Sequence, residues 1–249
     1  MNGGSLAVVL MLAAVLELET SWAGPATTEE LVETGRLLAL LLDAGRITIA
    51  NKQPLINDRK RGDKGYSPVV FEQELSENFR QRTGLNLFSL QQSNVPEVAK
   101  QLLPSLVQAS KKTVGDVRHI INLEGIGFKG FIPAVFGTTT ASTFRSYTEV
   151  YLRQTMNPAR NPQNAPDEFE RRMLARFADP TYPRQSDGIL SEVVNEGKAV
   201  RVMLPLYYQK ACLACHGEPK GERDLSGYPK EGAKEGDLGG AISVKLQVP

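Results

Sequence analysis

Apolar residues recur at helical spacing in two stretches of the chain, and each stretch is followed by a Gly-Lys-Gly loop and a proline. The pattern predicts, in both places, a long helix, a loop and a shorter helix that begins at Pro68 or Pro133. Proline favours the first turn of a helix because the N–H that it lacks would have no partner there. The apolar positions of the long helices are Leu37, Leu38, Leu41, Leu102, Leu103 and Leu106.

The two stretches resemble one another in sequence. When the chain is shifted by 65 residues, positions 36–91 align without gaps on 101–156, and 17 of the 56 pairs are identical. Chance would give about 3 or 4 identities, so the sequence predicts an internal duplication.

Strands are predicted mainly in the last two thirds of the chain. The segments are 86–90, 150–155, 193–208 and 241–248. A short helix is predicted over 167–178, where acidic residues occupy the first turn, and residues 217–240 are predicted to be loop. Helices followed by strands favour an α+β domain over a doubly wound sheet.

Residues 6–16 form an unbroken apolar run that is too short to cross a bilayer, which takes about 20 residues. Small residues at Ser21 and Ala23 predict cleavage after Ala23, although no Lys or Arg precedes the run. We therefore expect residues 1–23 to be a signal peptide, with an uncleaved anchor as the alternative. The mature protein is expected to be periplasmic and to have no stable membrane span.

Composition narrows the classes of function. The 249 residues are 41% hydrophobic and 23% charged, as in ordinary globular proteins, and the net charge of +1 favours no nucleic-acid partner. The chain has only two cysteines and two histidines. Three of these four residues fall within the five positions from Cys212 to His216.

Cys-x-x-Cys-His is the attachment sequence of c-type haem. The thiols of Cys212 and Cys215 can bond the two vinyl groups of one porphyrin edge, while His216 reaches the iron. The sequence therefore predicts one covalent haem c. The alternatives are a structural disulfide, which leaves His216 unexplained, a thioredoxin-like pair, which lacks its βαβ context, and a zinc site that also needs His119.

Three segments resemble the signature blocks of a bacterial family of PAS-like c-type haem domains, found as exported cytochromes and as sensor halves of membrane kinases and chemoreceptors. The blocks are RNPQNAPDEFE at 160–170, CLACHGEPKG at 212–221 and SGYPKEGAKEGDLGGAISV at 226–244. The resemblance covers nearly all of 36–247. It implies a PAS-like antiparallel sheet with haem between sheet and helices, thioether bonds at Cys212 and Cys215, and His216 as proximal ligand. We expect a first helical repeat unit over 24–100 and the PAS-like haem domain, with the second unit, over 101–249.

The distal iron ligand is left open by the resemblance. Some members use a cysteine of the amino-terminal helix, but Ile49 and Val114 occupy the corresponding positions here. His119 and Met156 are candidates, and Met203 is a further thioether. Otherwise the position holds water or is vacant, which would let NO or CO bind.

Other residues are candidates for contact with the haem. Arg153, Arg160 and Lys220 are cations that could bind the propionates. The apolar segment 203–208, just before the attachment sequence, is either a wall of the haem pocket or an ordinary buried strand.

Two functions fit these observations. The first is electron transfer or redox sensing in the periplasm, and the alternative is a haem-based sensor of NO or CO that works through a partner protein. Both imply a redox or signalling partner, and self-association stays open. Catalysis has the least support because no acid, base or nucleophile constellation accompanies the motif.

Overall fold

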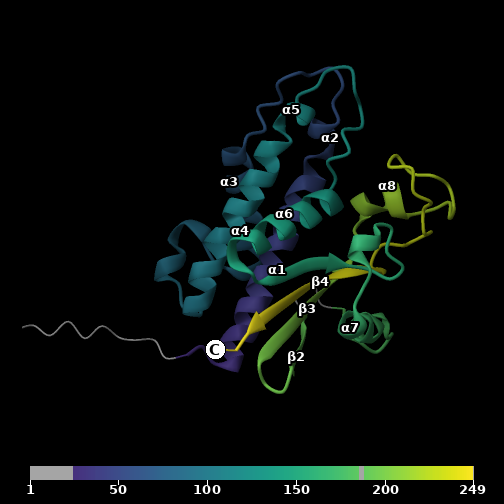
Figure 1. Cartoon of the computed structure of the whole chain (residues 1–249). Coiled ribbons are helices and arrows are strands. Elements are labelled where there is room, and N and C mark those ends of the chain that lie inside the picture. The colour runs from purple at the N-terminus through teal and green to yellow at the C-terminus, as the bar shows by residue number, and fades with distance from the viewer. Residues whose placement is uncertain (1–24, 185–187, 249) are drawn as a thin grey trace, which may run out of the picture.

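The computed structural model describes residues 25–184 and 188–248, so the expected signal peptide over 1–23 lies outside the described residues. The predicted α+β class is confirmed: a helical bundle covers one face of a four-stranded antiparallel sheet, and helix α7 lies on the other face (Figure 1). Within the described ranges, no helix is long and apolar enough to cross a membrane.

The predicted pattern of helices is confirmed in both copies, in the same register. The first copy folds into α1 (Thr28–Asn51), α2 (Gln53–Ile56) and α3 (Pro68–Thr83), and the second into α4 (Glu97–Asp116), α5 (Arg118–Ile121) and α6 (Pro133–Thr148). Pro68 and Pro133 each open their helix, as the sequence predicts. The equal spacing of matching elements shows that the duplication extends from sequence to structure.

The Gly-Lys-Gly loops join the two copies by reciprocal hydrogen bonds. The Lys64 backbone N–H donates to Asn122 Oδ1 at 3.2 Å, and the Lys129 N–H donates to Asn57 Oδ1 at 2.9 Å. Both lysine side chains are buried and donate to carbonyls of their own loops. These residues therefore brace the copies into one bundle, and the predicted boundary after residue 100 falls inside α4.

The sheet has the order β1-β4-β3-β2, with every neighbouring pair antiparallel. Its strands are β1 (Tyr151–Thr155), β2 (Leu190–Val194), β3 (Ala199–Tyr207) and β4 (Leu238–Gln247). The predicted strand over 193–208 is divided: Asn195 and Glu196 adopt positive φ and turn the chain from β2 into β3. Strand β4 begins at Leu238, so the end of the loop predicted over 217–240 is strand.

The strand predicted at 86–90 is wrong. These residues enter the 3-10 helix η1 (Leu87–Gln92), where Asn86 Oδ1 accepts the Phe88 N–H at 2.9 Å. The equivalent segment of the second copy becomes β1 because it pairs with β4, whereas η1 packs beside α3 and α4. Equivalent segments of the two copies therefore take different structures. Residues 151–155 pair with β4, whereas residues 87–92 form a 3-10 helix.

Alternating side chains of β3 divide the interior into two clusters. Val200, Val202 and Leu204 pack with the helical bundle, and Met203 packs with α7 (Glu168–Ala178). Helix α1 approaches the sheet closely at Gly35, where a Cβ would stand 2.7 Å from Val202 Cγ2. This approach places the first copy, and not only the second, directly on the sheet.

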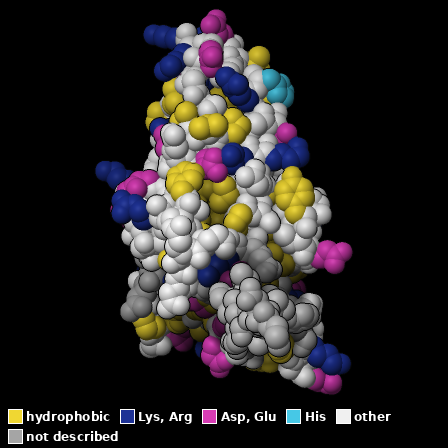
Figure 2. Space-filling model, turned by 90° about the vertical axis from the view of Figure 1, so that its left-hand side faces the viewer, with side chains coloured by type: hydrophobic (Ala, Val, Ile, Leu, Met, Phe, Trp, Pro, Cys, Tyr) yellow, Lys and Arg dark blue, Asp and Glu magenta, His cyan; other side chains and the backbone are white. Residues whose placement is uncertain are grey.

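One face of the molecule carries charges of both signs among exposed apolar side chains (Figure 2). The apolar side chains exposed over the described chain include Val69, Phe88, Val135, Tyr147 and Leu225. No single sign of charge dominates the face that Figure 2 shows.

Candidate functional site

The CxxCH segment, defined as Cys212–His216, follows β3 after a short connection. Cys212 ends the 3-10 helix η3 (Lys210–Cys212), and Cys215 and His216 lie in the single turn α8 (Leu213–His216). Both thiols are free and half-buried, and burial raises the pKa of Cys215. The structure therefore presents two unpaired thiols and one imidazole within about one helical turn.

His216 is held on one side of its ring. Its Nδ1 lies 2.9 Å from Glu231 Oε2 and 3.2 Å from the Tyr208 hydroxyl, and the Tyr208 ring stacks on it with centroids 4.7 Å apart. Burial and the nearby Arg160 lower the pKa of His216. A carboxylate accepts only, so we assign the proton to Nδ1, which leaves the Nε2 lone pair free to bind a metal.

Arg160 ties three segments of the site together. Its Nε and Nη2 bond the two carboxylate oxygens of Glu231 at 2.6 and 2.7 Å, and its Nη1 bonds Asp224 Oδ2 at 2.7 Å. Its Nη2 also donates to the Cys215 carbonyl at 2.8 Å. One guanidinium therefore links the block at 160–170, called the RNP block below, to the CxxCH segment and to Glu231, which bonds His216.

The loop after the CxxCH segment is ordered by its own hydrogen bonds. Asp224 Oδ1 accepts from the N–H groups of Ser226 and Tyr228, and Arg160 lies over the Tyr228 ring at 5.7 Å. The Ala233 N–H donates to the His216 carbonyl at 2.8 Å. Glu231 is thereby carried back to the imidazole from 15 residues further along the chain.

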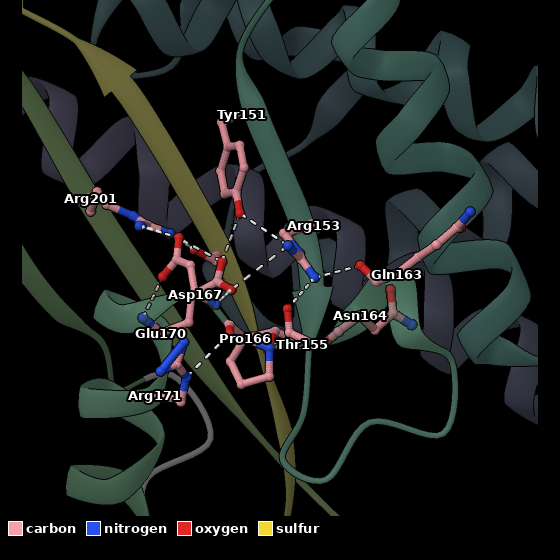
Figure 3. A network of polar contacts seen from close by, with 12 residues as sticks. Tyr151, Arg153, Thr155, Gln163, Asn164, Pro166, Asp167, Glu170, Arg171 and Arg201 are labelled. Carbon is pink, nitrogen blue, oxygen red and sulfur yellow. Dashed lines mark hydrogen bonds and ion pairs between the residues drawn. The ribbon is translucent and has the colours of Figure 1, made fainter.

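The second half of the RNP block anchors α7 to the sheet (Figure 3). Asp167 caps α7 and forms a capping box with Glu170, whose buried carboxylate bonds Arg201 at 3.1 Å and Tyr151 at 3.0 Å. Asp167 also bonds Arg201, at 2.6 Å. The end of the RNP block therefore links β1, β3 and α7. The helix predicted over 167–178 is confirmed as α7.

The three proposed distal ligands lie in different parts of the fold. His119 is exposed on α5, and α5 and α8 stand well apart in Figure 1. Met203 is fully buried in the cluster beneath α7. Met156 is half-buried at the end of β1, next to Gly240, and the neighbouring Gly239 lies against the Tyr208 ring. Met156 is thereby connected, through Gly240 and Gly239, to the Tyr208 ring that stacks on His216.

The proposed propionate ligands also have defined places. Arg153 donates to the carbonyls of Gln163 and Ala165 at 2.6 and 2.9 Å, which closes the turn of the RNP block. Arg160 is occupied by Glu231 and Asp224, as described above. Lys220 lines a shallow surface pocket of about 360 Å³ next to Arg160, Tyr228 and Lys230.

The structure bears on two of the alternatives to haem. Cys212 and Cys215 form no disulfide with each other. Over the part of the chain that is described, no group of three or more His, Cys, Asp or Glu side chains gathers as a metal site, so the set of ligands that zinc would require is not assembled.

Sequence reasoning missed Asp224 and Glu231, and it named Tyr208 only as part of the apolar segment 203–208. Glu231 lies within the third block of the family resemblance, which was the available signal, but nothing in the sequence indicates that it bonds His216. Tyr208 was grouped with the apolar residues before the motif, where its hydroxyl carried no separate meaning.

A comparison with known protein families matches nearly the whole described chain. A family model described as Tll0287-like matches residues 26–247, which spans both helical copies, the sheet and the CxxCH segment. Among solved structures, the chain is similar to the crystal structure of the cyanobacterial heme-protein Tll0287, with a TM-score of 0.43 and 22% identity. That alignment covers 61% of this chain and 96% of the other. No curated protein matches the chain.

Proposed function

Since the chain belongs to the Tll0287-like family, we propose that it is a c-type haem protein that binds one haem through thioether bonds at Cys212 and Cys215, with His216 as the proximal iron ligand. The observation that carries the proposal is the CxxCH segment with two free thiols beside an imidazole whose Nδ1 is bonded to Glu231. The protein Tll0287, whose name the family shares, is described as a heme-protein.

The residues present fit a haem of this kind. Metal-binding histidines usually donate their second ring N–H to a carboxylate or carbonyl, and Glu231 occupies that position at 2.9 Å from Nδ1. The thiols must be unpaired to form thioethers, and both are. Bound haem would supply a one-electron couple.

The role that follows from this site is electron transfer or redox sensing in the periplasm, with a redox or signalling protein as partner. The expected signal peptide supports export, and covalent haem attachment takes place on the exported side in bacteria. Because side chains fill the interior between the sheet and the helical bundle, a haem held by α8 would lie beside that interior, with His216 as its iron ligand.

Absorption spectra test this proposal. The protein, purified from a host with haem-attachment machinery, should show the sharp reduced bands of a c-type haem, and Cys212→Ser with Cys215→Ser should abolish covalent retention of the pigment. A wild-type protein that carries no pigment, or releases it on acid–acetone extraction, contradicts the proposal.

Reversible binding of NO or CO is the second candidate function. The position of His119, exposed on α5 and apart from α8, favours it because this histidine is then not available as a second iron ligand. Addition of CO to the reduced protein should shift its Soret band if the distal position is open. An unchanged spectrum favours electron transfer, with Met156 as the ligand to test by Met156→Ala.

A further inference from the structure

His216 stands at the end of a chain of alternating charges. Glu231 bonds its Nδ1, Arg160 bonds both oxygens of Glu231, and Asp224 bonds Arg160. The chain is largely shielded from solvent: the exposed fractions are 0% for the Asp224 side chain, 16% for Arg160 and 30% for Glu231. Charges in such surroundings interact more strongly than they would in water.

The geometry makes Glu231 the group that sets the donor strength of the imidazole. A carboxylate that accepts the Nδ1–H pulls the proton toward itself and increases the electron density at Nε2, so the ring becomes a more basic metal ligand. A more basic ligand stabilises the oxidised iron, which carries the higher charge.

Arg160 acts in the opposite sense on the same carboxylate. Its two bonds to Glu231, at 2.6 and 2.7 Å, withdraw negative charge from the oxygen that faces His216. Asp224 and the Cys215 carbonyl fix the guanidinium in this position. The two residues therefore form a matched pair, one that strengthens the imidazole as a donor and one that limits the effect.

We propose that Glu231 and Arg160 are positioning residues that together set the reduction potential of the bound haem, Glu231 lowering it and Arg160 raising it. The inference rests on the proposed function, because it concerns the iron ligand His216. The measured reaction is uptake of one electron by the holo-protein from dissolved dithionite through mediators, and the scheme involves no proton transfer.

Glu231→Gln is the first test. The amide keeps a hydrogen-bond acceptor of the same size but carries no charge, so the potential should rise. We expect the ratio of reduced to oxidised protein at a fixed applied potential to increase at least tenfold, which is about 59 mV for one electron. Glu222→Gln is the matched control, because Glu222 lies in the same loop, is 54% exposed and bonds Lys230 at 3.6 Å.

Arg160→Gln should shift the ratio in the other direction, toward the oxidised protein. Arg160→Lys keeps the positive charge but cannot bond both oxygens of Glu231, so it should shift the ratio the same way by less. If Glu231→Gln cannot be prepared with covalent haem, the reduced-to-oxidised ratio of Arg160→Lys tests the inference instead. A shift of Arg160→Lys toward the reduced form, or one no larger than that of Glu222→Gln, overturns the inference.

The covalent haem content of every protein is measured first. Wild-type protein without covalent haem contradicts the proposed function and this inference together. Loaded Glu231→Gln whose ratio stays within twofold of Glu222→Gln, or which shifts in the same direction as Arg160→Gln, overturns this inference alone and leaves the haem proposal standing.

Discussion

Single side chains distant in sequence determine the geometry around the CxxCH segment. Arg160 precedes the segment by more than fifty residues, yet it donates to the Cys215 carbonyl and bonds Asp224 and Glu231 from the following loop. The segment itself contributes little apolar packing, because none of its side chains is fully buried. Its placement therefore depends on charged hydrogen bonds more than on a hydrophobic core.

This dependence predicts a distinctive response to acid at Asp224. Burial opposes its ionisation, but hydrogen bonds from Ser226 and Arg160 outweigh that effect and lower the pKa of Asp224 to about 2. A carboxyl whose folded pKa is below its unfolded value of 3.8 stabilises the protein above that value, and the stabilisation is lost as the pH falls from about 4 toward 2.

Asp224→Asn should therefore be less stable than wild type at pH 7, by about 1.5–3 kcal/mol for lost hydrogen bonds to a charged group, and the difference should shrink below pH 4. Thermal unfolding at pH 7, 4 and 3 measures this. Asp237→Asn is the control, since Asp237 accepts a backbone hydrogen bond from Lys234 in the same loop. A difference from wild type that is constant with pH contradicts the prediction.

At the level of elements, periodicity predicted the helices well and the strands less well. The helices of both copies carry apolar residues at helical spacing, and the shorter ones begin at recognisable signals such as Pro68, so local sequence suffices. A strand needs a neighbour as well as a suitable sequence, and 86–90 has none: Asn86 instead caps the turn that becomes η1. The division of 193–208 into β2 and β3 depends on positive φ at Asn195 and Glu196, which no apolar pattern reveals.

The contact between α7 and the sheet supplies a prediction at the same level. Glu170 is fully buried and is paired with Arg201, which is itself 8% exposed. Removal of Glu170 breaks its buried hydrogen bonds to Arg201 and Tyr151, while Arg201 keeps its bond to Asp167, so the cost is that of lost hydrogen bonds to a charged group, about 1.5–3 kcal/mol. Glu170→Ala should therefore lower the free energy of unfolding by this amount, measured by urea denaturation.

Glu168→Ala is the matched control for that measurement. Glu168 carries the same charge on the same helix, but its side chain is exposed. Its removal should change stability by less than about 1 kcal/mol. Equal losses in the two variants would mean that the buried network contributes no more than a surface charge.

For the whole molecule, the duplication produces one bundle, with helices of both copies packed against each other and α1 placed on the sheet. The α+β class could be predicted and the CxxCH segment singled out, because helical periodicity and a five-residue motif are local signals. The partners of His216 could not, because Tyr208 and Glu231 meet it only after the loop has folded back.

Processing is the next prediction at this scale. If residues 1–23 are a signal peptide, amino-terminal sequencing of protein secreted to the periplasm should begin near Gly24. Recovery of the chain in membrane fractions with Met1 retained would replace the processed form with an anchored one.

The intact mass of the purified protein tests the central claim most directly. Protein made in a host with haem-attachment machinery, denatured before measurement, should have the mass of its polypeptide plus one haem, and Cys212→Ser combined with Cys215→Ser should remove that addition. A wild-type mass equal to the bare polypeptide, with two free thiols or one disulfide, would contradict the account.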